Sequence, residues 1–245
     1  MIILDGKKIA EKILKKVKRE IREKQLKLKL AVILLGRNPQ SAVFVRQKQK
    51  ACEKIGIDFK LLKFPERIQE VKLLEKIKAI SKDDSITGII VQLPLPKHIN
   101  EDRVLKSVPK KKNAEIVSPV VCAVEHILKN YKISLRNKNI VLIGKGRLVG
   151  RPVAAWLRKQ NIKFFNIDKI TNRIKKADII ISGAGRPGLI KGETIKSGAV
   201  IIDVGGDVDF ESVSQKAGYI TPIPGGVGPV VVACLLQNLV KTKNY

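Results

Sequence analysis

The sequence has few of the features that indicate a nucleic-acid surface or a membrane anchor. Aromatic residues make up only 4% of the chain, which leaves few rings on which bases could stack. No apolar run is long enough to span a membrane. The N-terminus has Asp5 early and no long apolar segment, so we do not expect a signal peptide.

Cysteine and histidine are scarce as well. The three cysteines, Cys52, Cys122 and Cys234, show no C-x-x-C spacing, and we expect them to be reduced thiols in a cytoplasmic protein. The two histidines lie far apart in the sequence. The sequence alone therefore predicts no metal site.

Acidic residues are outnumbered, because 22 Asp and Glu face 49 Lys and Arg, for a net charge of +27. One interpretation is a basic nucleic-acid-associated protein. The other is a lysine-rich chain with solvated helix faces, which we favour because the lysines are spread along the chain. We therefore do not expect nucleic acid as a partner, although the charge should attract phosphorylated or polyglutamylated ligands.

What remains is a globular composition, with 44% hydrophobic and 29% charged residues over 245 positions, enough for one large or two small domains. The first half alternates amphipathic segments with short apolar runs, which predicts a parallel sheet flanked by helices. The expected helices span residues 8–25, 41–55 (capped by Ser41), 69–81 and 102–107, and the expected strands span residues 30–35, 58–63 and 88–93.

The second half repeats this alternation after a polar stretch that ends near Val117. We predict helices over residues 120–131 and 230–240, and strands over residues 140–143, 161–167, 177–182, 199–204 and 219–220. The fold class is thus α/β in two domains. An N-terminal parallel α/β substrate domain spans residues 1–117, a Rossmann-like dinucleotide-binding domain spans residues 118–229, and the C-terminal helix 230–245 returns to the first domain.

A glycine turn follows the strand at residues 140–143. Gly144, Gly146 and Gly150 form G-x-G-x-x-x-G, and Pro152 opens a helical pattern. Glycines let backbone N–H groups approach a pyrophosphate, and the start of a helix adds positive potential. An ordinary tight turn is the alternative interpretation. Asp168, near the end of the next predicted strand, is either a ribose ligand or a plain turn residue.

Three further features point to a ligand. Lys48 shares a helix face with Ser41, Phe44 and Cys52, a face that we expect to point inward, where a lysine would have a shifted pKa. Gln92 interrupts an apolar strand at its carboxyl end, where parallel sheets bind ligands. The loop PIPGGVGP is rigid and glycine-rich. The alternatives are a surface lysine, a glutamine that is hydrogen-bonded to a loop, and a structural turn.

These segments together resemble the FolD family, bifunctional methylenetetrahydrofolate dehydrogenase/methenyltetrahydrofolate cyclohydrolase. The resemblance runs nearly end to end. The segments that carry it are LDGKKIA, LLGRNPQSAVFVRQKQKACEKIGI, ITGIIVQLPLPKHI, GKGRLVGRP, ADIIISGAGRPGLI and ITPIPGGVGPVVVACLLQN.

The resemblance implies roles for individual residues. Lys48 falls at the family's catalytic lysine, Gln92 at the glutamine that supports it, and Phe44 where a tyrosine is usual, with a ring that can still stack on folate. The other implied substrate-binding residues are Ser41, Leu93, Pro94, Glu115, Gly225, Gly226 and Pro229. The implied cofactor-binding residues are Gly144, Lys145, Gly146, Arg147, Gly150, Asp168 and Gly183.

The chain also departs from the family pattern. The family's K-D-V-D-G aligns with residues 111–115 and puts its pterin-binding aspartate at Ala114, with Glu115 as the substitute if the register slips by one. A stretch of about a dozen residues that usually follows is missing, and Val231 replaces a usual threonine. The dehydrogenase scaffold is thus better kept than the pterin pocket.

The resemblance implies oxidation of 5,10-methylenetetrahydrofolate to the 5,10-methenyl form, followed by hydrolysis to 10-formyltetrahydrofolate, in a homodimer. We expect NADP as cofactor, because Lys145 and Arg147 could hold its 2′-phosphate and the resembled family most often uses NADP. NAD is the alternative, because an acidic residue at the position of Asp168 disfavours a 2′-phosphate. A second hypothesis is a dehydrogenase with weak or lost cyclohydrolase activity, or with an altered pterin substrate. A third is a basic nucleic-acid-associated protein on the same fold.

Overall fold

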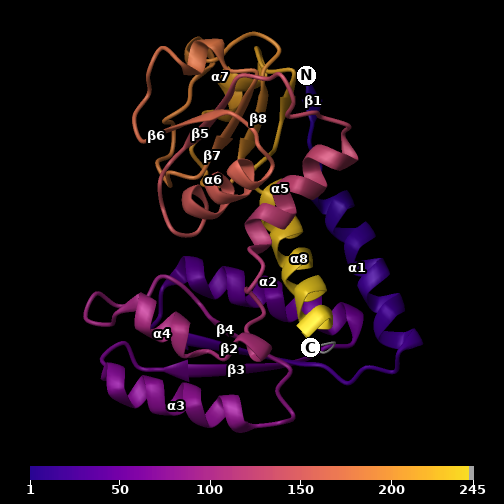
Figure 1. Ribbon diagram of the computed structural model, residues 1–245, viewed down its shortest axis with the longest axis vertical. Coiled ribbons are helices and arrows are strands. Elements are labelled where there is room, and N and C mark those ends of the chain that lie inside the picture. Colours follow the sequence, from indigo (N-terminus) through magenta and orange to yellow (C-terminus); the bar gives the residue numbers. More distant parts are fainter. Residues whose placement is uncertain (243–245) are drawn as a thin grey trace. The chain divides into compact units, whose positions relative to one another are not determined.

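The computed structural model describes residues 1–242 and divides the chain into two compact units (Figure 1). Unit 1 contains residues 1–11 and 118–234, and unit 2 contains residues 12–117 and the chain from Leu235 onward. The helices α1 (Gly6–Glu23) and α8 (Val227–Thr242) each contribute residues to both units. Among the described residues, no helix combines the length and the apolar character needed to cross a membrane.

Unit 2 is built on a three-stranded parallel sheet in the order β3-β2-β4. The strands are β2 (Lys29–Leu35), β3 (Asp58–Phe64) and β4 (Gly88–Val91). The central β2 is buried from Leu30 to Leu35, which explains its continuous apolar run. Three α-helices belong entirely to this unit: α2 (Pro39–Ile55), α3 (Glu70–Lys82) and α4 (Glu101–Ser107).

The two faces of this sheet are covered by different helices. Ala31 and Ile33 pack with Leu73 and Ile77 of α3 and with Val104 of α4 in one apolar cluster. Figure 1 shows α2 on the opposite face from α3. This arrangement confirms the predicted alternation of strands and helices.

From Leu235 to Thr242 the final helix packs in unit 2, as predicted; residues 243–245 of the predicted helix lie outside the described residues. A Cβ atom on Gly88 would overlap the side chain of Leu239, so α8 lies directly against β4. Asn238 donates a hydrogen bond from Nδ2 to the Val117 carbonyl at 2.8 Å. The first contact ties α8 to the sheet of unit 2, and the second ties it to the last residue of the polar segment that ends at Val117.

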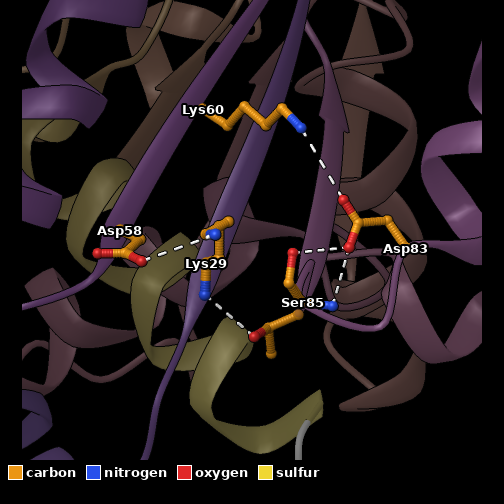
Figure 2. A network of polar contacts seen from close by, with 6 residues as sticks. Lys29, Asp58, Lys60, Asp83 and Ser85 are labelled. Atoms are coloured by element: carbon orange, nitrogen blue, oxygen red, sulfur yellow. Dashed lines mark hydrogen bonds and ion pairs between the residues drawn. The ribbon is translucent and has the colours of Figure 1, made fainter.

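Polar residues surround the beginnings of these strands (Figure 2). Lys29 lies 3.8 Å from Asp58, and Lys60 lies 3.9 Å from Asp83. The Asp83 carboxylate accepts hydrogen bonds from the Ser85 hydroxyl at 2.6 Å and from its backbone N–H at 3.0 Å. These bonds, more than the lysines, lower the pKa of the Asp83 carboxyl. Because the ion pairs are exposed, their contribution to stability is small.

Unit 1 is built on a six-stranded parallel sheet in the order β1-β9-β8-β7-β5-β6. The strands, in chain order, are β1 (Ile2–Ile3), β5 (Ile140–Ile143), β6 (Phe164–Ile167), β7 (Ile179–Ser182), β8 (Val200–Asp203) and β9 (Tyr219–Ile220). Its helices include α5 (Pro119–Asn130), α6 (Gly150–Lys159) and α7 (Phe210–Ser214). The parallel order and the helical crossovers agree with the predicted Rossmann-like class.

The start of the chain belongs to unit 1, although the sequence placed residues 1–117 together. The reason is β1, a strand that was not predicted: it pairs with β9, with Ile2 opposite Tyr219 and Ile3 opposite Ile220. Leu4 extends the pairing by donating its N–H to the Ile220 carbonyl at 2.8 Å. Two residues are too short for a sequence pattern to reveal a strand.

Candidate functional site

The helix α2 presents the residues that the sequence singled out in unit 2. It begins at Pro39, and its N-cap is Asn38, whose side chain accepts a hydrogen bond from the Ser41 N–H. The prediction of Ser41 as cap was therefore wrong, because Pro39 starts the helix two residues earlier. Ser41 is instead buried, and its hydroxyl donates to the Leu93 carbonyl at 3.3 Å.

Lys48 and Gln92 form a buried polar pair. Lys48 is 8% exposed and Gln92 is 9% exposed. The Lys48 ammonium donates to Gln92 Oε1 at 2.6 Å, and Gln92 Nε2 donates to the Leu93 carbonyl at 2.8 Å. The amide is thus oriented by Leu93 and aims its oxygen at Lys48. The surface-lysine interpretation is excluded, and so is the view that Gln92 bonds only to a loop.

Burial perturbs the protonation of this lysine. Desolvation is the largest effect and lowers the pKa of Lys48, while the charges of Glu115 and, more weakly, Cys52 raise it. Cys52, one helical turn further along α2, is fully buried, and desolvation raises the pKa of its thiol to about 12. Lys48 therefore releases its proton more readily than a surface lysine, while Cys52 holds its proton.

Glu115 is the carboxylate whose charge raises the pKa of Lys48. Desolvation raises the pKa of the Glu115 carboxyl, and Lys48 lowers it. The residue is nevertheless exposed, so protein atoms surround a carboxyl group that solvent still reaches, and its desolvation is only partial. Ala114, by contrast, is 0% exposed. Of these two neighbouring residues, Glu115 is therefore the one whose acidic side chain a ligand could reach.

Phe44 does not follow the inward orientation that the sequence predicted for its helix face. It is 47% exposed, while the buried positions of α2 are Ser41, Val45, Lys48, Cys52 and Ile55. The buried face of the helix includes Val45 rather than Phe44. Val45 lies four residues after Ser41 and three before Lys48, and this spacing puts all three on one face. The ring lies open to solvent, in the same helix turn as the buried Ser41. Pro94 is exposed as well, and Leu93 is partly buried.

The glycine turn of unit 1 fits a bound pyrophosphate. Gly144 has φ +96°, and a Cβ there would lie 2.7 Å from the Gly183 carbonyl oxygen. A Cβ on Gly150 would collide with Gly144, and one on Gly183 with Val149. Gly146 has no atom near its missing side chain, so its backbone faces open space. Because α6 begins at Gly150, before the predicted Pro152, its N-terminal N–H groups lie at this turn.

Charged residues stand beside the turn. Lys145 lies 3.2 Å from the Asp168 carboxylate, directly after β6. The guanidinium of Arg186 donates to the Asp168 carbonyl at 3.3 Å. Arg147, in the same turn as Lys145, is partly buried. Lys145 therefore pairs with the Asp168 carboxylate, and Arg186 holds the backbone of the same residue.

Two buried carboxylates that the sequence analysis missed hold the neighbouring turn. Asp207, 0% exposed, accepts from the Ser182 hydroxyl and from the N–H groups of Ala184 and Arg186, at 2.8 and 2.5 Å. Asp203 accepts N–H bonds from the three residues 206–208. Desolvation raises the pKa of Asp203 despite these bonds. The signal was the run D-V-G-G-D directly after an apolar strand, where a carboxylate can satisfy turn N–H groups.

The loop PIPGGVGP, residues 222–229 and called the Pro–Gly loop below, packs against the start of the chain. Gly225 has φ +108°, and its carbonyl accepts the Lys7 N–H at 3.1 Å. A Cβ on Gly6 would collide with Gly226, and the Gly226 N–H donates to the Pro222 carbonyl at 2.8 Å. Pro229 lies in the first turn of α8. Part of the glycine requirement is thus structural, because the loop packs against residues 6 and 7.

The predicted residues therefore gather in two groups. Unit 2 holds the substrate-side set: Ser41, Phe44, Lys48, Gln92, Leu93, Pro94 and Glu115. Unit 1 holds the cofactor set with the Pro–Gly loop: Gly144, Lys145, Gly146, Arg147, Gly150, Asp168, Gly183, Gly225, Gly226 and Pro229.

Comparisons with known proteins identify a family for both parts of the chain. The family model described as tetrahydrofolate dehydrogenase/cyclohydrolase, catalytic domain, matches residues 4–115, and its NAD(P)-binding domain model matches residues 118–245. The bifunctional protein FolD of Nautilia profundicola is 40% identical over 282 positions, covering 100% of this chain and 98% of the relative. That of Aquifex aeolicus is 38% identical, covering 98% and 94%.

Solved structures show the same likeness. The bifunctional FolD enzyme of Campylobacter jejuni has a TM-score of 0.91 at 38% identity, covering 100% of this chain and 99% of that one. The FolD of Trypanosoma brucei, complexed with NADP cofactor and inhibitor, has a TM-score of 0.94 at 29% identity, covering 100% and 97%. By sequence and by fold, the chain belongs to the tetrahydrofolate dehydrogenase/cyclohydrolase family.

Proposed function

We propose that the protein oxidises 5,10-methylenetetrahydrofolate to 5,10-methenyltetrahydrofolate with NADP⁺, and then hydrolyses this product to 10-formyltetrahydrofolate. The observation that carries the hydrolytic half is the buried Lys48–Gln92 pair, in which a 2.6 Å hydrogen bond fixes an amine of lowered pKa. Any buried lysine needs a hydrogen-bond partner. General acid–base catalysis needs, in addition, a fixed position and a tuned pKa, which the 2.6 Å bond and the lowered pKa of Lys48 support.

In this mechanism the neutral Lys48 amine acts as the base. One of its N–H groups donates to Gln92 Oε1, which leaves the nitrogen lone pair for a water molecule. As that water attacks the methenyl carbon, its proton passes to Lys48 Nζ, and the C–O bond forms while the positive charge of the methenyl bridge is neutralised. The carbinolamine that results then collapses to the formyl group: its hydroxyl proton leaves to solvent, the C–N5 bond breaks, and N5 takes a proton from the Lys48 ammonium. The Glu115 carboxylate raises the pKa of Lys48 and so stabilises the ammonium that results.

Substrate binding would use the exposed groups around this pair. The Phe44 ring is open to solvent and offers a face on which a pterin or benzoyl ring can stack. The Glu115 carboxylate can accept hydrogen bonds from pterin N–H groups. The Leu93 carbonyl already accepts hydrogen bonds from Ser41 and Gln92. Leu93 and Pro94 would therefore contribute apolar contacts to the substrate.

The dehydrogenase half uses the glycine turn of unit 1. Bound there, NADP⁺ supplies a hydride acceptor for the methylene carbon. The turn's N–H groups and the start of α6 would hold the pyrophosphate. Lys145 lies 3.2 Å from the Asp168 carboxylate and would offset its repulsion of a 2′-phosphate, to which Arg186 and Arg147 would contribute positive charge. Asp207 would act at one remove, by fixing the turn that carries Arg186.

A second candidate is a dehydrogenase that has lost the hydrolytic step or prefers an altered pterin. Two observations favour it: Phe44 offers no hydroxyl beside Lys48, and the alanine at position 114 is fully buried. The retained Lys48–Gln92 pair favours a protein with both activities. Burying an amine lowers the stability of the fold, and a role in hydrolysis would explain why it is kept. We also infer a cytoplasmic homodimer; none of the three cysteines forms a disulfide, in keeping with a reducing compartment.

The test is Lys48→Met, with Lys50→Met as control on the exposed side of the same helix. Methenyltetrahydrofolate hydrolysis, followed by loss of its absorbance and corrected for the uncatalysed rate, should fall about 100-fold or more in Lys48→Met. It should stay unchanged in Lys50→Met, and NADPH formation should persist in both. Equal hydrolysis by Lys48→Met and wild type would exclude the base. Hydrolysis absent from wild type while NADPH forms would establish the second candidate.

A further inference from the structure

A cluster of side chains of the types that ligate metals lies in unit 1. Cys122 and His126 are four residues apart on α5, so they share one face of that helix. Cys234 comes from α8, more than a hundred residues later. The two sulfur atoms and a ring nitrogen of His126 all lie within 4.8 Å of one another. Spacing along the chain did not reveal this cluster, because only the fold brings Cys234 to the other two residues.

The donor set selects the class of metal. Two thiols and an imidazole suit zinc and other borderline or soft ions, whereas magnesium and calcium require oxygen ligands. Zn–S bonds of about 2.3 Å and Zn–N bonds of about 2.0 Å in a tetrahedron put the donor atoms roughly 3.5–3.8 Å apart. From a largest separation of 4.8 Å, the donors need to approach by about 1 Å, which side-chain rotation can supply.

Burial gives the cluster both a fixed side and an open side. Cys234 is 0% exposed, while Cys122 and His126 are only partly buried. An ion could therefore enter past the two α5 residues and reach Cys234 behind them. Three protein ligands leave one of four positions for water or another small ligand, as in open zinc sites.

We propose that Cys122, His126 and Cys234 form a zinc-binding site that clamps α5 to α8 within unit 1. Each thiol that binds loses its proton to solvent, so two protons leave when the dication binds two thiolates and a neutral imidazole. The clamp joins the helix that leads into β5 to the helix that follows the Pro–Gly loop. Zinc occupancy would thus stiffen the segments before and after the cofactor-binding half of unit 1.

Cobalt provides the direct test, because Co²⁺ replaces zinc and absorbs visibly when tetrahedral. The full chain, without a histidine tag, is reduced, freed of metal and titrated with Co²⁺ under anaerobic conditions. We expect thiolate-to-cobalt charge-transfer absorption and strong d–d bands that saturate at one equivalent and disappear when Zn²⁺ is added. Zn²⁺ should also raise the Tm, by on the order of 5 °C at a hundredfold excess over Kd.

Variants decide which residues are responsible. Cys122→Ser and His126→Gln, both at partly exposed positions, should weaken Co²⁺ binding at least tenfold and remove the charge-transfer or d–d intensity. Cys52→Ser and His98→Gln are matched controls in unit 2 and should bind as wild type does. Far-ultraviolet circular dichroism checks that each variant is folded. Absence of the spectrum in reduced wild type, or unchanged binding by folded Cys122→Ser, overturns the proposal, as does a Cys122–Cys234 disulfide that resists reduction.

Discussion

Replacing Gln92 by leucine tests whether the Lys48–Gln92 bond has the energetic weight that its burial implies. The bond is 2.6 Å long between two side chains that are each less than 10% exposed. When Lys48 is protonated, this is a hydrogen bond to a charged group, which contributes about 1.5–3 kcal/mol, and its loss leaves the buried ammonium without that acceptor. We therefore expect Gln92→Leu to lower the free energy of unfolding by about 1.5–3 kcal/mol, although leucine is apolar like the neighbouring Val91 and Leu93.

Gln49→Leu is the matched control for this change. Gln49 lies on the same helix as Lys48 and makes a hydrogen bond of 3.0 Å to Glu53 at an exposed position. Its replacement should change the free energy of unfolding by less than about 0.5 kcal/mol. The pair thus compares two glutamine hydrogen bonds of similar length that differ in burial.

Urea unfolding can report the two units separately. The single tryptophan, Trp156, lies in α6 of unit 1, so its fluorescence follows that unit, while circular dichroism follows both. Gln92→Leu should shift the circular-dichroism transition, and the double variant with Lys48→Met should recover most of the loss, because the orphaned amine is gone. A Gln92→Leu effect no larger than that of Gln49→Leu would refute the reasoning, since the bond would then carry no special weight.

Two further predictions concern the charges around the candidate sites. Because the Glu115 carboxylate raises the pKa of Lys48, Glu115→Gln should lower it further, and the rise of the hydrolysis rate with pH should move to lower pH; a rate profile that moves up or stays in place would contradict Lys48 as the base. Lys145→Gln should leave Asp168 unneutralised and reduce kcat/KM for NADP⁺ about tenfold, with that for NAD⁺ nearly unchanged; equal losses with both cofactors would show that Lys145 does not read the 2′-phosphate.

The parts of the fold that sequence predicted best are those that a local pattern determines. The buried run at residues 30–35 and the glycine turn after residue 143 both carry their structural reason in consecutive residues. The misses are of another kind. Two-residue β1 is defined only by its partner β9, and the inward face of α2 passes through Val45 rather than Phe44, which residue spacing alone left ambiguous.

The same distinction applies to the functional residues. Lys48 could be singled out by its neighbours on the helix, but its hydrogen bond to Gln92 joins positions 44 residues apart. Asp207 reaches back 23 residues to Ala184 and 25 to Ser182, and a single sequence does not show which N–H groups a carboxylate will satisfy. Cys234 meets Cys122 and His126 only because α8 returns beside α5. Long-range pairing is what the sequence could not supply.

The packing around Ala114 disfavours a carboxylate at that position. Its Cβ atom would lie 3.3 Å from a Cβ on Gly88, beside Leu239, and it is fully buried. An aspartate in that place would be a charge in an apolar contact between β4 and α8, at a cost of several kcal/mol unless paired. Glu115 follows directly and projects where Lys48 feels its charge. We infer that the one-residue shift trades a buried carboxylate for a longer, solvated one, which keeps a negative group near Lys48 while the core beneath β4 stays apolar.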